Sequence, residues 1–192
     1  MTILHIDSSI TGENSVSREL SAAIVKELLA ADPGARVVTR DLVAQPLDHL
    51  TLAGFGSDES RAVLEEFKAA DTIVIGAGFY NFSIPSQLKA WFDRILVAGE
   101  TFRYTENGPE GLAGDKTVIV ALARGGFYGE ESPMRSIEHA ESYMAAALGF
   151  IGIKNPRFVI AEGIAIGPEQ RASSLAQAHR QVPEAAARAL AA

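Results

Sequence analysis

Short apolar runs alternate with longer segments of helical periodicity along the whole chain. Thr72–Gly76 (TIVIG) and Lys116–Leu122 (KTVIVAL) are continuous and rich in β-branched residues, a pattern typical of strands buried on both faces. Three further runs complete the set of predicted strands: Thr2–Ile6, Arg36–Arg40 and Arg157–Ala161. The pattern therefore predicts five strands.

Helices are predicted between these strands. Val16, Leu20, Ile24 and Leu28 recur every four residues and so share one helix face, with Asn14 or Ser15 at the N-cap. Three more helices are indicated by similar spacing: one carrying Val63, Leu64 and Phe67 and ending near Asp71, then Pro85–Ala98 and Pro133–Gly149. An Ala-rich helix, which Pro183 kinks or restarts, ends the chain. The irregular segment Thr101–Leu112 has a turn at Glu106-Asn107-Gly108 and is able to pair as a hairpin.

This alternation predicts a doubly wound α/β fold, with a five-stranded parallel sheet and helices on both faces. We find no internal repeat, linker or shift in composition, so we expect a single domain over residues 1–192. In such a sheet ligands bind outside the carboxyl ends of the strands. We therefore expect the ligand site in the loops that follow the predicted strands.

Composition excludes several functional classes. The 192 residues contain no cysteine, which excludes a disulfide scaffold, a thiolate metal site and a catalytic thiol. The net charge of −7 and the lack of a basic run argue against nucleic acid as a partner. There is no apolar stretch long enough for a membrane span and no signal peptide, so we expect a cytoplasmic protein. The four histidines are scattered, and no metal site is expected: His5, His49, His139 and His179.

The loop after the first strand, Asp7–Ser17, is rich in hydroxyls and opens a helix. Unpaired N–H groups and the partial positive charge of a helix N-terminus suit a phosphate. Neither GxxxxGK[ST] nor GxGxxG is present, so hydroxyls and backbone amides would hold the phosphate without a lysine. The alternative is that Ser15 or Asn14 only caps the helix.

Two further loops suit a flat ring. Phe79-Tyr80-Asn81-Phe82 follows the third strand and combines apolar walls with one amide, as a heteroaromatic ligand requires, although the aromatic residues are also able to plug the core. Ala123-Arg124-Gly125-Gly126 follows the fourth strand, where paired glycines permit close backbone approach to a ligand or simply a tight turn. One loop for a phosphate and two for a ring predict a mononucleotide site.

Six segments, in order along the chain, resemble one known family. They are Ser9 with Ser15-Val16-Ser17, Phe79–Phe82, Thr101–Leu112, Arg124-Gly125-Gly126, Leu148–Ile153 and Ala161–Ala165. The chain is thereby similar to the FMN-dependent NADH:azoreductases, also NADH:quinone oxidoreductases, of the bacterial cytoplasm. The resemblance implies a flavodoxin-like homodimer with one FMN per subunit. It also implies a ping-pong reaction in which NADH or NADPH reduces the flavin, which then passes two electrons to an azo compound or a quinone.

The resemblance also assigns residues to this site. Phosphate contacts fall to Ser9, Ser15, Val16 and Ser17, and the flavin lining to Phe79, Tyr80, Asn81 and Phe82. Backbone contacts to the pyrimidine side of the ring fall to Ala123, Arg124, Gly125 and Gly126. Phe102 would close the neighbouring subunit's site, with Phe150 and Tyr128 in the substrate pocket.

Three departures from the family pattern bear on the pocket. Ala123 stands where relatives often have serine, Phe127-Tyr128 stand where some have histidine, and Leu47–Ser60 is shorter than in many relatives. Hydride transfer requires positioning above all, so no general acid or base is assigned, although Tyr128 is a candidate proton donor. Arg124 is expected either to favour an anionic reduced flavin or to form a surface salt bridge.

Two other functional classes share this fold. A flavodoxin-type electron carrier without a substrate of its own is the main alternative. Such carriers usually have a strongly acidic face, and −7 over 192 residues is modest. A receiver-type regulatory domain would need clustered acids after the first strand, where Asp7 stands alone.

Overall fold

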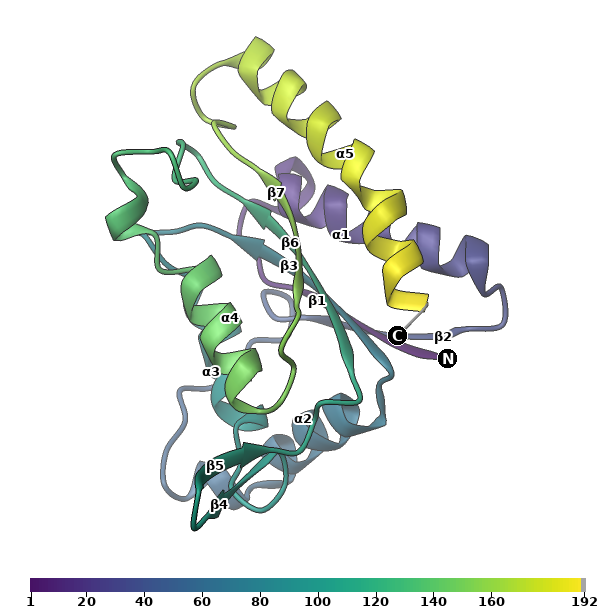
Figure 1. Ribbon diagram of the computed structural model, residues 1–192, viewed down its shortest axis with the longest axis vertical. Coiled ribbons are helices and arrows are strands. Elements are labelled where there is room, and N and C mark those ends of the chain that lie inside the picture. Colours follow the sequence, from purple (N-terminus) through teal and green to yellow (C-terminus); the bar gives the residue numbers. More distant parts are fainter. Residues whose placement is uncertain (191–192) are drawn as a thin grey trace.

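A five-stranded parallel sheet forms the centre of the computed structural model, which describes residues 1–190 (Figure 1). Its strand order is β2-β1-β3-β6-β7, and every neighbouring pair is parallel. The strands are β1 (Thr2–Asp7), β2 (Arg36–Asp41), β3 (Thr72–Gly78), β6 (Thr117–Ala123) and β7 (Arg157–Ala161). The prediction of a doubly wound α/β fold with a five-stranded parallel sheet is confirmed.

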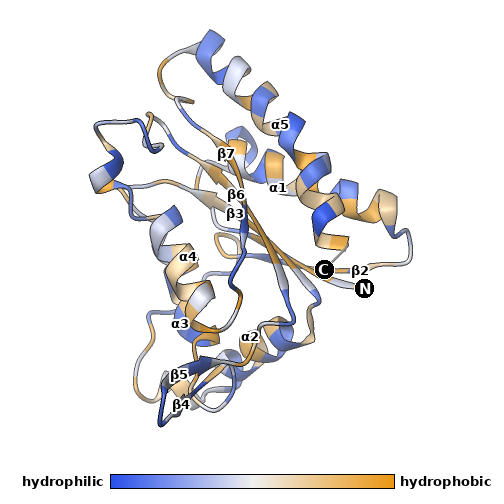
Figure 2. Cartoon of the chain, viewed as in Figure 1, coloured by the Kyte–Doolittle hydropathy of each residue, from blue (hydrophilic) through white to orange (hydrophobic). Residues whose placement is uncertain are grey.

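Helices cover both faces of the sheet (Figure 1). One face carries α1 (Val16–Ala31) and α5 (Pro168–Leu190), and the other carries α2 (Asp58–Ala69), α3 (Ser86–Ile95) and α4 (Glu141–Phe150). Successive side chains of a strand point to opposite faces. Ile73 and Ile75 of β3 accordingly join the α2–α4 side of the core, whereas Val74 joins the α1–α5 side. Burial on both faces explains why the central strands are apolar throughout, as Figure 2 shows.

A hairpin extends from the sheet, as the Thr101–Leu112 segment suggested. β4 (Phe102–Thr105) pairs antiparallel with β5 (Gly108–Gly111). It packs against the end of α4, where the rings of Phe102 and Phe150 lie 4.6 Å apart between centroids. Gly111 lies so close to the chain after α4 that a Cβ there would be 2.1 Å from the backbone nitrogen of Gly152. A glycine is therefore required at this contact.

The prediction of a helix over Pro133–Gly149 is wrong about where the helix begins. Its first part is a short 3₁₀ helix, Arg135–Ile137, and α4 begins only at Glu141. The carboxylate of Glu138 accepts hydrogen bonds from the N–H groups of Ala140, Glu141 and Ser142 at 2.9, 2.8 and 3.2 Å. Because these bonds satisfy the first free N–H groups, the helix starts there.

The C-terminal helix runs through Pro183 as one element, so the proline does not restart it. Two further 3₁₀ turns, Gly12–Asn14 and Gly54–Gly56, precede α1 and α2. Among residues 1–190, no helix combines the length and apolar character needed to cross a membrane.

Candidate functional site

The loops after β1, β3 and β6 meet at the carboxyl ends of the central strands. β1 and β3 are adjacent, and the chain extends outward from them in both directions, which places the topological switch point between them. The Ser8 N–H donates to Gly76 O at 3.1 Å, and the Phe79 N–H donates to Ala123 O at 3.0 Å. The structure thus brings together the three loops that the sequence singled out.

The first loop, between β1 and α1, has the donors that an anion requires. Ser15 caps α1 by accepting the Arg18 N–H at 3.2 Å, as the capping alternative proposed, and its hydroxyl also contacts that of Ser17 at 3.1 Å. Ser9, Ser15 and Ser17 are all buried. The backbone N–H groups of Val16 and Ser17 have no hydrogen-bond partner among residues 1–190. Free N–H groups and hydroxyls at a helix N-terminus suit a phosphate.

Arg18 holds this loop in place, a role that sequence analysis missed. Its Nε and Nη2 atoms each donate to the carbonyl oxygen of Ser9 at 3.1 Å, and its guanidinium forms a bidentate pair with Asp41 at 2.8 Å. The hydrogen bonds from Arg18 lower the pKa of Asp41 to about 2, although partial burial opposes the shift. Arg18 thereby ties Ser9 to the end of β2.

The Asp41 pair makes stability depend on pH. Because its pKa is lower in the folded chain, ionised Asp41 stabilises the fold above its ordinary pKa of 3.8, and this contribution disappears as pH falls toward about 2. We therefore expect Asp41→Asn to reduce the free energy of unfolding at pH 6, with the deficit shrinking below pH 4. Urea unfolding across this range measures it, with exposed Asp48→Asn as the control. A deficit that stays constant down to pH 3 would contradict the assignment.

The second loop is a tight turn with an unusual backbone. Tyr80 and Ser83 exchange N–H···O bonds of 2.9 and 3.1 Å around Asn81 and Phe82, whose φ angles are +47° and +72°. Two successive non-glycine residues in the left-handed region store strain, which is commonly found at functional sites. Phe82 is 45% exposed and Asn81 is exposed, so neither plugs the core. The side chain of Asn81 is exposed and lines a pocket, so its amide is accessible to a ligand.

The third loop uses its carbonyl groups internally and leaves its donors free. The carbonyl oxygens of Arg124, Gly125 and Gly126 accept hydrogen bonds from the chain after β7 at 3.2, 3.0 and 2.9 Å. The N–H groups of Gly125, Gly126 and Phe127 have no acceptor within residues 1–190. A row of free N–H groups is suited to bind the carbonyl oxygens or negative charge of a ligand.

Tyr128 covers this third loop. Its ring packs on that of Phe79, with centroids 4.6 Å apart, and a Cβ at Gly126 would lie 3.2 Å from it. The structure therefore places Tyr128 beside the second and third loops. Its role as a proton donor stays a prediction.

Arg124 forms ion pairs, but they are buried rather than on the surface. Its side chain is 1% exposed and pairs with Glu138, Glu141 and Glu162. Burial opposes the charge, yet hydrogen bonds to Glu141 and Glu162 and the field of Glu138 raise the pKa of Arg124. Glu162 also accepts the Tyr128 N–H at 2.8 Å. Through Glu162, the Arg124 guanidinium thus helps to fix the position of the third loop.

A pocket of about 580 Å³ adjoins the first two loops. Ile10, Tyr80 and Asn81 line one side, and His49 and Leu50 line another. The last two belong to the segment Leu47–Ser60, which is shorter than in many members of the family that the sequence resembles. This segment therefore borders the candidate site.

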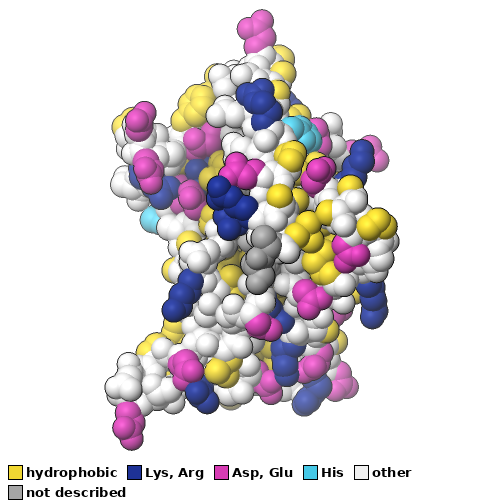
Figure 3. Space-filling view, turned by 45° about the vertical axis from the view of Figure 1, so that its right-hand side comes forward, with side chains coloured by type: hydrophobic (Ala, Val, Ile, Leu, Met, Phe, Trp, Pro, Cys, Tyr) yellow, Lys and Arg dark blue, Asp and Glu magenta, His cyan; other side chains and the backbone are white. Residues whose placement is uncertain are grey.

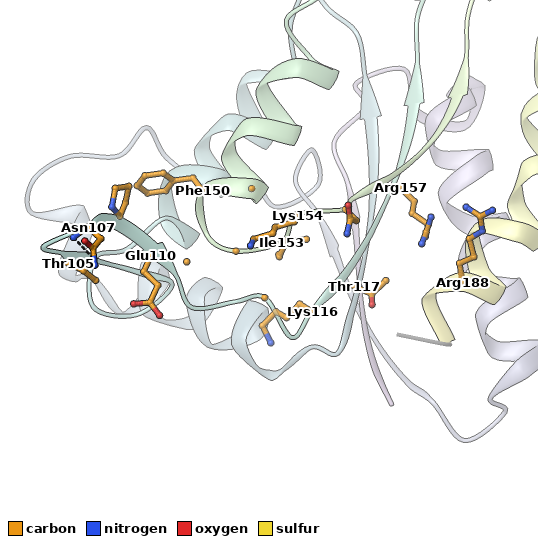
Figure 4. A pocket seen from close by; sticks show the side chains of 16 residues that line it. Thr105, Asn107, Glu110, Lys116, Thr117, Phe150, Ile153, Lys154, Arg157 and Arg188 are labelled. Carbon is orange, nitrogen blue, oxygen red and sulfur yellow. Dashed lines mark hydrogen bonds between the residues drawn. The ribbon is translucent and has the colours of Figure 1, made fainter.

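A larger groove, of about 1040 Å³, lies at the opposite end of the sheet (Figure 4). It includes Thr117 and Arg157, the first residues of β6 and β7, together with Phe150 beside the hairpin. Phe102 packs on Phe150, so this pair lies together but away from the three loops of the same chain. This groove is therefore separate from the candidate site.

Comparison with known proteins places this arrangement in a family. The family described as "Flavodoxin-like fold" matches residues 1–185. An FMN-dependent NADH:quinone oxidoreductase of Xanthomonas campestris pv. campestris is 52% identical, covering 95% of this chain and 98% of the relative. FMN-dependent NADH:quinone oxidoreductase 2 of Bradyrhizobium diazoefficiens is 54% identical, covering 93% of this chain and 95% of the relative. The chain belongs to this flavodoxin-like family.

Solved structures of azoreductases share the architecture. An azoreductase from Bacillus anthracis str. Sterne superposes with a TM-score of 0.87 at 30% identity, covering 97% of this chain and 98% of the other. An FMN-dependent NADH-azoreductase from Bacillus anthracis str. Ames Ancestor, in complex with FMN, has a TM-score of 0.86 at 26% identity, covering 98% and 99%. The resemblance inferred from the sequence is thus confirmed for the family and the fold.

Proposed function

We propose that this chain is an FMN-dependent oxidoreductase that uses NADH or NADPH to reduce quinones and azo compounds. One observation carries the proposal: free donors from three loops converge at the carboxyl ends of β1, β3 and β6. The names of the relatives, FMN-dependent NADH:quinone oxidoreductase and azoreductase, support the same activity.

The hydrogen-bond donors of the three loops are of the types that the phosphate and the ring of FMN require. Ser9, Ser15 and the N–H groups of Val16 and Ser17 would hold the phosphate, with the helix dipole favouring its charge. The ring would lie against the Phe79–Phe82 loop, with Asn81 as a polar contact and the N–H groups of Gly125 and Gly126 toward its pyrimidine side. When bound, FMN supplies a carrier that accepts a hydride and passes on two electrons. The chain's own task is to position the ring and the substrate.

We further propose that the chain works as a single domain in a cytoplasmic homodimer. Phe102 of the hairpin packs against Phe150 at the end of α4, away from the three loops of their own chain, so the pair would complete the pocket of a second subunit. Of the two rings, Phe150 is the exposed one, whereas Phe102 is 8% exposed and supports it. The exposed rings of Phe82 and Phe150 support this, because a partner subunit would cover them. Sedimentation of the purified protein tests the dimer.

The alternative drawn from the sequence, an electron carrier without its own substrate, is not favoured by the names of the relatives. The face in Figure 3 mixes acidic and basic side chains and shows no strongly acidic docking surface. The purified protein is expected to show a flavin spectrum and to consume NADH when menadione or methyl red is supplied. A flavoprotein that does not turn over NADH would favour the carrier, and a protein that cannot be reconstituted with FMN would overturn both readings.

Asn81→Ala should weaken FMN retention by roughly five- to tenfold, because it removes the exposed side-chain amide of the second loop. Fluorescence titration of the reconstituted protein measures this. Ser173→Ala, at an exposed position of α5, is the matched control and should not change retention. Equal retention in both variants would remove Asn81 from the site.

A further inference from the structure

The segment Ala161–Ala165 is one of the six by which the chain resembles its family, yet the proposed function gives it no role. It begins at the last residue of β7. Its backbone N–H groups donate to the carbonyl oxygens of Arg124, Gly125 and Gly126 at 3.2, 3.0 and 2.9 Å. The backbone of this segment therefore holds the first part of the third loop.

The next stretch of chain, Phe127–Ser132, is held by a side chain instead. The Tyr128 N–H donates to Oε1 of the Glu162 carboxylate at 2.8 Å. Within the stretch, the Ser132 hydroxyl donates to the carbonyl oxygen of Phe127 at 2.7 Å, so the stretch closes on itself. The Glu162 carboxylate therefore connects this stretch to the end of β7.

Glu162 itself has a fixed position. The Arg124 guanidinium, which is buried, donates to the same Oε1 atom at 2.9 Å. The other carboxylate oxygen, Oε2, would lie 3.2 Å from a Cβ at Gly129, so the loop backbone passes close over it. The hydroxyl of Ser174 on α5 donates to the carbonyl oxygen of Glu162. The carboxylate is thus held from several sides at the place where it accepts the Tyr128 N–H.

The Tyr128 ring and the Phe79 ring form an aromatic pair at the carboxyl ends of the strands. Phe79 follows β3 and Tyr128 follows β6 in the chain, and their ring centroids lie 4.6 Å apart. The Tyr128 side chain is partly exposed, so one side of it is open to a ligand. Aromatic rings pack favourably on other flat rings, and quinones and azo compounds are flat. This aromatic pair therefore suits the substrates of the proposed function.

We propose that Glu162 is a positioning residue that sets the affinity for the quinone or azo compound. Through the Tyr128 N–H it fixes the ring against which this substrate packs, while Glu162 itself touches neither the flavin nor the substrate. This inference rests on the proposed function, because it requires a bound flavin and an electron-accepting substrate. A ring held in one place also loses no conformational freedom when the substrate binds, which favours binding.

Glu162→Ala is the direct test. The KM for menadione is measured with NADH in excess and with enough FMN to saturate every variant, so that cofactor loss does not enter. We expect KM to rise about fivefold or more while kcat changes less than about twofold, because losing an interaction that serves binding alone raises KM only. Glu169→Ala, at an exposed position of α5, is the matched control and should change neither. A loss in kcat with KM unchanged would contradict the proposal.

Two conservative variants separate the hydrogen bond from the charge. Glu162→Gln loses the charge but keeps a carbonyl oxygen that accepts the Tyr128 N–H, so KM should stay within about twofold of wild type. Glu162→Asp keeps the charge but is shorter by one C–C bond, about 1.5 Å, so KM should rise about fivefold. The aspartate variant also serves as the test if Glu162→Ala fails to fold. The reverse order would mean that the charge beside Arg124 matters and not the hydrogen bond, and would overturn the proposal.

Tyr128→Ala decides whether Glu162 acts through the ring, because it removes the ring and keeps the backbone N–H. This variant should raise the KM for menadione at least as much as Glu162→Ala. Adding Glu162→Ala to it should then change KM by less than about twofold, since two residues that act through one contact are not additive. Effects that multiply, or an unchanged KM in Tyr128→Ala, would overturn the proposal. A wild-type protein that binds no flavin or reduces no menadione would instead defeat the proposed function.

Discussion

Replacing Arg124 with methionine is expected to lower the free energy of unfolding by about 3–5 kcal/mol, the cost of breaking a buried ion pair from one side. The carboxylate of Glu138 is fully buried, and Glu141 and Glu162 share the same guanidinium. Without that cation three negative charges would lie close together, and among residues 1–190 the remaining ion-pair partner is Arg135, beside Glu138 and Glu141. Methionine preserves most of the volume, so the loss would report mainly on charge.

Urea unfolding measures this effect, and the hairpin offers a matched control. Arg103 also pairs with a glutamate, Glu110, but both side chains are about half exposed. Arg103→Met should therefore lower the free energy of unfolding far less than Arg124→Met does. If both variants lost a similar amount of free energy of unfolding, burial would not make the Arg124 ion pairs more important for stability than the exposed pair. Because Glu162 also accepts the Tyr128 N–H, Arg124→Met should additionally weaken FMN binding.

Gly111→Ala is expected to lower the free energy of unfolding by at least about 1–3 kcal/mol. The reason is that the added methyl group would meet backbone atoms and not a movable side chain. Its Cβ would lie 2.1 Å from Gly152 N and 2.2 Å from Ile151 C. The hairpin or the chain after α4 must shift to relieve this contact. The shift would also displace Phe102, which we propose to reach the partner's site.

Gly56→Ala is the control for this substitution, since nothing lies within 4 Å of a Cβ there. It should leave thermal stability nearly unchanged. If Gly111→Ala were equally neutral, the hairpin would not pack as closely as described. Preserved stability together with lost quinone reduction would instead separate the role of the hairpin in the site from its role in the fold.

Much of the fold was predictable because it follows from local patterns. Thr72–Gly76 has the continuous apolar run of a central strand, and the structure extends this strand only to Gly78. The α4 start was not predictable from periodicity. The apolar spacing continues through Pro133–Ala140, whereas the Glu138 carboxylate decides where the helix begins.

The three loops of the site were predictable from the rule for parallel sheets, but their internal contacts were not. Arg18 of α1 reaches Asp41 at the end of β2, and Arg124 reaches Glu162 beyond β7. Such pairs join residues far apart in sequence and leave no periodic signal. Likewise, the direction of the Tyr80 side chain depends on a turn with two positive φ angles, which composition does not reveal.

The central position of β3 has a consequence for how cofactor loss and unfolding are related. All seven of its residues are buried, and it has a hydrogen-bonded neighbour on each side. Its amide protons should therefore exchange with solvent only through global unfolding, whereas the loops at its carboxyl end should exchange through local opening. Flavin could then leave and return while the sheet stays closed. Reconstitution of the stripped protein would accordingly need no denaturant.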